Sequence, residues 1–128
     1  MSPAVIAAVL VAGAFGAVIR WAVTKIFASR SDFPRAVLVV NVVGSALAGI
    51  IFGLPDLRYD LYLVLVTGFC GGLTTFSTFS VDTVQLVLAG RTRTAVTSVL
   101  TNVVVGIAVA ALFYAVVSAI LPSQIRML

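Results

Sequence analysis

The sequence predicts an all-α membrane protein with four transmembrane helices, and three observations support this prediction. Of the 128 residues, 62% are hydrophobic and only 9% are charged, whereas a typical soluble domain has about 25% charged residues. The charged positions leave four apolar stretches, each long enough for the roughly 20 residues that cross a bilayer as a helix. Strict period-two alternation is absent, so helices are favoured over a β-barrel.

We expect a single transmembrane domain over residues 1–128, with spans at about 4–26, 36–54, 61–81 and 94–121. The first span contains Arg20, and the second and third are free of charge. Because no basic residue precedes the first span, we expect a mature span there and not a cleaved signal peptide. An even number of spans places both termini on the same side of the membrane.

The composition excludes several kinds of chemistry. The chain contains no His and no Glu, and Cys70 is its sole cysteine. Imidazole catalysis, imidazole metal ligation and an internal disulfide are therefore excluded. The formal net charge of +4 is spread along the chain, which argues against a nucleic-acid surface. We expect a protein that is neither an enzyme nor a nucleic-acid-binding protein.

Basic residues are distributed unequally between the two sides of the membrane. The connections between spans one and two and between spans three and four contain Lys25, Arg30, Arg35, Arg91 and Arg93. The opposite side contains Arg58 and Arg126. The positive-inside rule therefore predicts a multi-pass protein of the inner (plasma) membrane, with these two connections in the cytoplasm and both termini outside.

The third span has an unusual composition for a membrane helix. Residues 67–80 read TGFCGGLTTFSTFS, with two adjacent glycines and a run of hydroxyl side chains. Glycine weakens a helix, and Ser and Thr compete for backbone hydrogen bonds, so we predict a break near the middle of the span, at residues 71–75. Such a break survives in a membrane only where it is buried in protein or lines a polar path. In the alternative reading, the glycines allow close helix packing and the hydroxyls bond to their own helix.

A break would leave backbone carbonyls without helical donors. Two such ends facing each other across a dimer axis could bind a small cation through carbonyl oxygens, since no acidic side chain lies nearby. Phe76 and Phe79 are three residues apart and share one face of any helix that resumes after the break. Aromatic ring edges are weakly positive and would tolerate an anion along a path, although ordinary packing explains most Phe pairs.

The other spans contain a few polar residues with two possible roles. Asn41 in the second span, and Ser98 and Asn102 one turn apart in the fourth, would either bond to a neighbouring helix or face a wet cavity. Arg20, beside Trp21, would either extend to the membrane surface or attract anions into a vestibule. The pair Gly49-x-x-x-Gly53 is typical of close helix packing.

Residues 71–80, GGLTTFSTFS, resemble the signature of the small bacterial fluoride channels of the Fluc (CrcB) family. Residues 13–21 and 41–45 resemble that family's patterns in the first two spans, so the resemblance covers nearly the whole chain. It implies a passive, fluoride-selective channel that exports fluoride and reduces its toxicity in the cytoplasm. It also implies two antiparallel subunits, two pores along the dimer and a structural sodium ion (Na+) at its centre.

The resemblance also implies roles for single residues. The backbone carbonyls of Gly71 and Thr74 would bind the sodium ion, and Arg20 would lie in an aqueous vestibule. The residues expected along the pore are Asn41, Phe76, Ser77, Thr78, Phe79, Ser98 and Asn102. The chain departs from the family pattern at three places, which leaves fewer of the expected polar side chains along the pore. Ala36-Val37 replaces a Gly-Thr pair, Ser98 replaces a common Tyr, and Asn102 replaces a usual hydroxyl residue.

The partner subunit and two rival functions stay open at this point. A self-pairing antiparallel dimer favours equal basic counts on both sides, and the observed bias admits either a homodimer or a pair with an oppositely oriented homologue. A small four-span multidrug exporter would need a carboxylate in the first span, yet no acidic residue precedes Asp32. A purely structural membrane protein is the remaining alternative.

Overall fold

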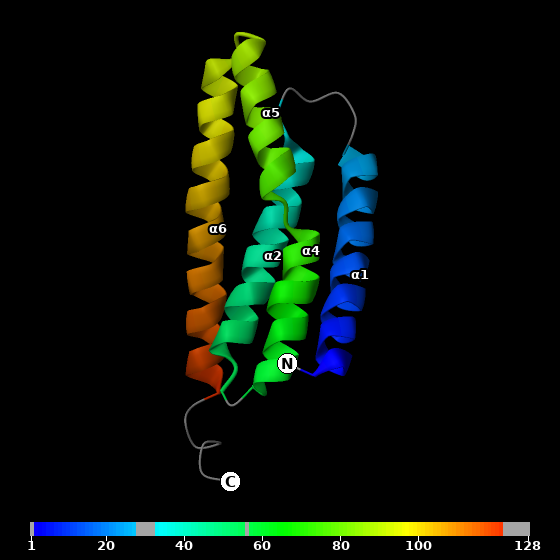
Figure 1. Cartoon of the computed structure of the whole chain (residues 1–128). Coiled ribbons are helices and arrows are strands. Elements are labelled where there is room, and N and C mark those ends of the chain that lie inside the picture. Colours follow the sequence, from blue (N-terminus) through cyan, green and yellow to red (C-terminus); the bar gives the residue numbers. More distant parts are fainter. Residues whose placement is uncertain (1, 28–32, 56, 122–128) are drawn as a thin grey trace.

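The structure is a computed structural model that describes residues 2–27, 33–55 and 57–121. Within these ranges the chain is helical throughout, apart from its connections (Figure 1). The elements are α1 (Pro3–Phe27), α2 (Arg35–Gly53), α3 (Tyr59–Tyr62), the π-helical segment η1 (Leu63–Cys70), α4 (Gly71–Leu73), α5 (Phe76–Leu88) and α6 (Thr92–Ile120). Arg30, Asp32 and Arg126, which entered the predictions above, lie outside the described residues.

Within the described residues, four helical stretches are long and apolar enough to cross a membrane, and the third of them, Tyr59–Leu88, combines α3, η1, α4 and α5. The prediction of an all-helical chain with four helices suited to spanning a membrane, the third of them interrupted, is thus confirmed. Large apolar side chains cover the outside of the bundle, and Leu10 and Phe15 are each 68% exposed. Monomeric soluble proteins rarely expose such continuous apolar surface, so this surface suits lipid or a partner subunit.

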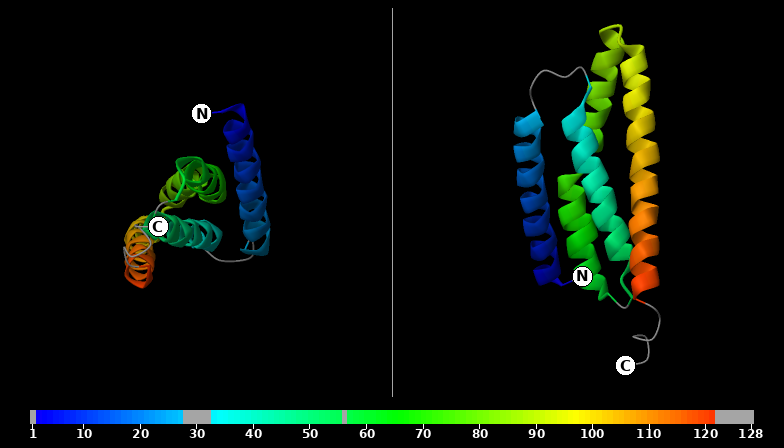
Figure 2. Two further views of the ribbon diagram at one scale, coloured as in Figure 1. Left: turned by 90° about the horizontal axis from the view of Figure 1, so that it is seen from below. Right: turned by 180° about the vertical axis from the view of Figure 1, so that it is seen from behind.

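The helices form two pairs that meet at the third span. The long helices α2 and α6 pack against each other, while α1 packs against η1 and α4, and α5 packs against α6 (Figures 1 and 2). The α2–α6 contact is close at Gly49, which faces the carbonyl of Ala110, and at Gly53, which faces Val117. The Gly-x-x-x-Gly pattern therefore serves helix packing, as predicted. Helix α1 begins and α6 ends at the same end of the bundle (Figure 1).

The third span leaves the helical conformation at two residues, Thr74 and Thr75. Thr74 has φ −79° and ψ 161°, and Thr75 has φ −146° and ψ 117°. By contrast, Gly71 has helical angles of φ −63° and ψ −37°. The break therefore lies at the C-terminal end of the predicted segment, after the glycine pair and not within it.

Glycines allow α1 and the third span to approach closely. A Cβ atom on Gly72 would collide with the carbonyl oxygen of Gly13, and one on Gly16 would lie against the carbonyl oxygen of Phe69 and 2.7 Å from the amide nitrogen of Leu73. Gly72 therefore agrees with the alternative interpretation, in which the glycines allow close packing between helices. Gly71 has room for a side chain, because the nearest atom to its added Cβ is the Val66 carbonyl oxygen at 3.7 Å, which is an ordinary van der Waals distance.

The two adjacent glycines allow a matched test of this packing. We expect Gly72→Ala to destabilise the protein by about 1–3 kcal/mol, since α1 would have to move away from α4. Gly71→Ala should cause a much smaller change, because it adds the same methyl group in a helical position with space around it. Thermal unfolding of both variants in detergent checks this, and equal losses of stability would contradict the packing role.

Candidate functional site

The break at Thr74 and Thr75 is held by a side chain from another helix. The Thr75 N–H donates to Oδ1 of Asn41 at 3.0 Å. In an unbroken helix the same N–H would donate to the carbonyl of Gly71, four residues earlier. The Asn41 amide thus replaces a helical carbonyl and satisfies a backbone donor that would be costly to leave unpaired in a membrane.

The helix resumes after the break through a side-chain cap. Oγ1 of Thr75 accepts the Thr78 N–H at 3.1 Å, and the same hydroxyl donates to Oγ1 of Thr78 at 2.9 Å. Threonine is a favoured residue at the position before a helix because its oxygen satisfies an amide that has no helical partner. Thr75 is buried, with 6% of its surface exposed. Through its amide and its hydroxyl it connects Asn41 of α2 to the first turn of α5.

Asn41 also bonds to the fourth span. Its Nδ2 donates to Oδ1 of Asn102 at 3.0 Å, and Nδ2 of Asn102 donates to the carbonyl of Ser98 at 3.0 Å. The two asparagines therefore form one chain of hydrogen bonds from α6 through α2 to the break. Asn41 therefore bonds to neighbouring helices, which is one of the two roles considered for it, and it also lines a cavity.

The residues around the break line a first open cavity of about 370 Å³, which we call the Asn–Phe cavity. Its lining consists of two amide side chains, two phenyl rings and hydroxyl or apolar residues: Asn41, Ser45, Thr74, Thr75, Phe76, Phe79, Asn102 and Val103. The Phe76 and Phe79 rings lie on one face with their centroids 6.1 Å apart and tilted by 44°. Phe76 is 80% exposed, so a large part of its ring is available to a ligand, to lipid or to a second subunit.

A second cavity of about 250 Å³, the Arg cavity, is lined by Ala17, Arg20, Trp21, Thr24, Val37, Val40, Thr75, Ser77 and Thr78. Thr75 lines both cavities. Ser77 and Thr78 of the first turn of α5 line this cavity, whereas Phe76 and Phe79 line the other. Among the described residues that line the two cavities, none is a carboxylate. The Val37 side chain occupies a position where a hydroxyl was expected and is 4% exposed.

Arg20 bonds to the backbone at the break. Its Nη1 donates to the carbonyl oxygen of Thr74 at 3.2 Å. The side chain does not simply extend along the helix towards the membrane surface, which was one of its two expected roles. It lies in the Arg cavity together with Ser77 and Thr78, where its positive charge is close to hydroxyl donors.

The two expected cation ligands differ in their surroundings. The Gly71 carbonyl has lost the Thr75 N–H to Asn41, and the Thr74 carbonyl accepts a single bond from Arg20. A carbonyl oxygen has two lone pairs, so each oxygen retains capacity for a hard cation such as Na+. Among the described residues no group of three or more His, Cys, Asp or Glu side chains could hold a metal ion. A cation site here would therefore depend on backbone oxygens.

Ser98 lies apart from the two cavities. Its side chain is 0% exposed, and its hydroxyl oxygen has no hydrogen-bond partner among the described residues. Only its backbone carbonyl takes part in the network, as the acceptor for Asn102. Its place along the pore stays a prediction.

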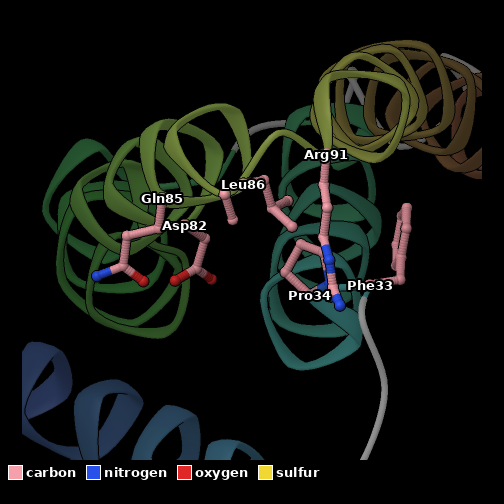
Figure 3. Close-up of a pocket in the computed structure, with 7 residues that line it drawn as sticks. Phe33, Pro34, Asp82, Gln85, Leu86 and Arg91 are labelled. Carbon is pink, nitrogen blue, oxygen red and sulfur yellow. The ribbon is translucent and has the colours of Figure 1, made fainter.

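A further cavity of about 360 Å³ lies near the turn between α5 and α6 (Figure 3). Asp82 and Gln85 lie beside each other on α5, and Arg91 lies beside Pro34 and Phe33 (Figure 3). None of these residues lines the Asn–Phe or Arg cavity. Helix α5 continues past Asp82 as far as Leu88, so this acidic residue lies within the helix, and its cavity lies near one end of the bundle.

Sequence reasoning did not single out Thr75 as a functional residue, although it lies at the centre of the site. Its amide binds Asn41, its hydroxyl caps α5, and its side chain lines both cavities. The signal available in the sequence was a threonine directly before an apolar helical segment, which is typical of a helix start. The distant acceptor for its amide could not be recognised in that way.

Comparison with known proteins shows which family the chain resembles. Residues 7–116 match the family described as "CrcB-like protein, Camphor Resistance (CrcB)". The chain is 38% identical over 111 residues to "Fluoride-specific ion channel FluC" of Pyrococcus horikoshii, which covers 84% of this chain and 90% of that protein. It is 40% identical over 102 residues to the FluC protein of Pyrococcus furiosus, covering 77% of this chain and 83% of that one.

A bacterial relative is similar over a greater length. "Fluoride-specific ion channel FluC 1" of Yersinia pseudotuberculosis is 36% identical over 116 residues, which is 87% of this chain and 91% of that protein. The family match and these relatives extend over most of the chain, and the family match includes the residues of the break and of both cavities. The chain belongs to the CrcB family.

Proposed function

We propose that this chain is a fluoride-selective ion channel that lets fluoride leave the cell passively and so reduces fluoride toxicity in the cytoplasm. The observation that carries the proposal is the break in the third span, with uncharged donors and ring edges around it, in a chain whose relatives are named fluoride-specific ion channels. Those relatives are named as channels and not as enzymes, which agrees with the absence of His and Glu from the sequence.

The chemistry of the two cavities suits a small anion. Fluoride is strongly hydrated, so a path must replace its water with donors but must not bind it with a full charge. The amide of Asn41, the hydroxyls of Ser77 and Thr78, and the edges of Phe76 and Phe79 are such groups. We also propose that Asn102 and Ser98 lie along this path: Asn102 lines the Asn–Phe cavity, and the buried Ser98 hydroxyl, which has no partner among the described residues, could donate to an anion.

Arg20 would attract anions towards this path. Its side chain lies in the Arg cavity beside Ser77 and Thr78, and a cationic group in a cleft raises the local concentration of anions. Its guanidinium already donates a hydrogen bond to the Thr74 carbonyl, so that N–H group is not available to an anion. Its role is therefore to concentrate fluoride near the entrance and not to bind it.

We propose that the functional unit is a dimer of antiparallel subunits with two pores. Much of the Phe76 ring and the outer face of α1 are exposed in the single chain, so a second subunit could complete the Asn–Phe cavity. A structural sodium ion at the dimer centre fits the Gly71 and Thr74 carbonyls. One chain offers two such oxygens, and the second subunit would have to supply the others.

The first test is fluoride efflux from liposomes that contain the purified protein, with chloride efflux as the control. We expect rapid fluoride efflux and little chloride efflux. Phe76→Ile and Phe79→Ile should each lower fluoride efflux by about tenfold or more, since an aliphatic side chain of similar bulk has no positive edge. Size-exclusion chromatography checks that the variants still assemble, and undiminished efflux in both would contradict their place in the pore.

The second test concerns the partner subunit and the orientation of the chain. The basic residues favour one orientation, with the termini outside the cell. Pairing with an oppositely oriented homologue needs only that orientation, whereas a homodimer needs the chain to insert both ways. A single cysteine introduced at Ser2, in a variant without Cys70, should then be labelled from one side of intact cells. Equal labelling from both sides would mean dual insertion and would favour the homodimer.

A further inference from the structure

We propose that Asn102 is a positioning residue of the pore, which fixes the direction of the Asn41 amide so that a donor of that amide is presented to the fluoride path. The inference rests on the proposed channel function and assigns to Asn102 a role through Asn41. The two side chains meet through the bond from Nδ2 of Asn41 to Oδ1 of Asn102, and both line the Asn–Phe cavity.

The direction of the Asn41 amide follows from the groups around it. The Thr75 N–H can only donate, so the Asn41 atom that faces it must be the acceptor Oδ1. Nδ2 of Asn41 must then face Asn102, and Asn102 must present its own oxygen. If the Asn41 amide were turned over, two donors would face each other at Thr75.

The direction of Asn102 is set independently from its other end. Its Nδ2 donates to the backbone carbonyl of Ser98, one turn earlier in α6. A carbonyl can only accept, so this contact requires the nitrogen of Asn102 on the side of α6 and leaves its oxygen for α2. Two backbone groups of opposite polarity, the Ser98 carbonyl and the Thr75 N–H, thus fix the whole chain of bonds.

This arrangement determines which donor remains for an anion. A carboxamide nitrogen carries two hydrogens, and Asn41 uses one of them on Asn102. Asn41 lines the cavity that contains Phe76 and Phe79, so its second hydrogen is an amide donor that the cavity can offer to fluoride. Without Asn102 the first hydrogen would lose its acceptor, and the Asn41 side chain would lose one of the two contacts that hold it.

The proposal sets a clear requirement on the side chain at position 102. It must accept a hydrogen bond from Asn41 and donate one to the Ser98 carbonyl. A threonine can do both with one hydroxyl, because Ser and Thr commonly donate to the carbonyl four residues earlier in a helix. An aspartate can accept but not donate, and its charge would face the Ser98 carbonyl. A leucine of similar size can do neither.

Fluoride efflux from liposomes ranks these variants. We expect Asn102→Leu to lower the efflux rate by about tenfold, as expected for the loss of one or two hydrogen bonds at a fixed amide. Asn102→Thr should restore the rate to within about threefold of the unmodified protein, and Asn102→Asp should remain as low as the leucine variant. Thr97→Val is the control, since it removes a polar group from an exposed position of the same helix and should not change efflux.

A spectroscopic readout tests the mechanism without any flux. Asn41 and Asn102 are the two asparagines of the chain, so labelling asparagine with ¹⁵N gives two side-chain amide signals. Added fluoride should shift the Asn41 signal more than the Asn102 signal. In Asn102→Thr the Asn41 proton that bonds to residue 102 should keep its chemical shift and its slow exchange with water. In Asn102→Leu the same proton should move towards the shift of an unbonded carboxamide and exchange faster.

Several results would overturn the proposal. These are unchanged efflux in Asn102→Leu, low efflux in Asn102→Thr with normal assembly, or a fluoride shift confined to Asn102. If Asn102→Leu does not assemble, the comparison of Asn102→Thr with Asn102→Asp decides in the same way. Absence of fluoride efflux in the unmodified protein would count against the channel function, whereas the amide signals of Asn41 would still test the positioning role.

Discussion

The structure depends on one hydrogen bond, from the Thr75 N–H to the side chain of Asn41. Breaking a helix in a membrane leaves backbone groups without partners, and each such group is costly in hydrocarbon. Here the Thr75 N–H donates to Asn41, and the Thr78 N–H donates to the Thr75 hydroxyl. The Thr74 carbonyl accepts a hydrogen bond from Arg20. The break can therefore exist at membrane depth because α2, α1 and the side chain of Thr75 at the break itself supply its partners.

The same set of bonds places the two cavities next to each other. Because Thr75 is extended, α5 begins with Phe76 and Phe79 on one side and Ser77 and Thr78 on the other, and Thr75 itself lines both cavities. The groups that meet there are amides, hydroxyls and ring edges, with one cation at the margin. Such groups can replace the water around a small anion without trapping it, which is why this geometry supports a channel and not a binding protein.

Much of the fold could be predicted from composition, since charge-free stretches of spanning length leave few alternatives to membrane helices. The distorted third span followed from its glycines and hydroxyls, and the shared face of Phe76 and Phe79 followed from their spacing. The position of the break after the glycine pair could not be predicted, because the acceptor for the Thr75 amide lies 34 residues away in sequence. The pairing of Asn41 with Asn102 spans 61 residues and likewise depends on how α2 packs against α6.

The most direct test of the central claim is to measure the carbon chemical shifts of Thr74 and Thr75 by solid-state NMR in lipid bilayers, in the unmodified protein and in Asn41→Leu. The account predicts extended-backbone shifts at both residues in the unmodified protein. In Asn41→Leu it predicts a movement towards helical values, because the Thr75 amide would return to the Gly71 carbonyl. Helical shifts in the unmodified protein, or extended shifts that persist without Asn41, would contradict the account.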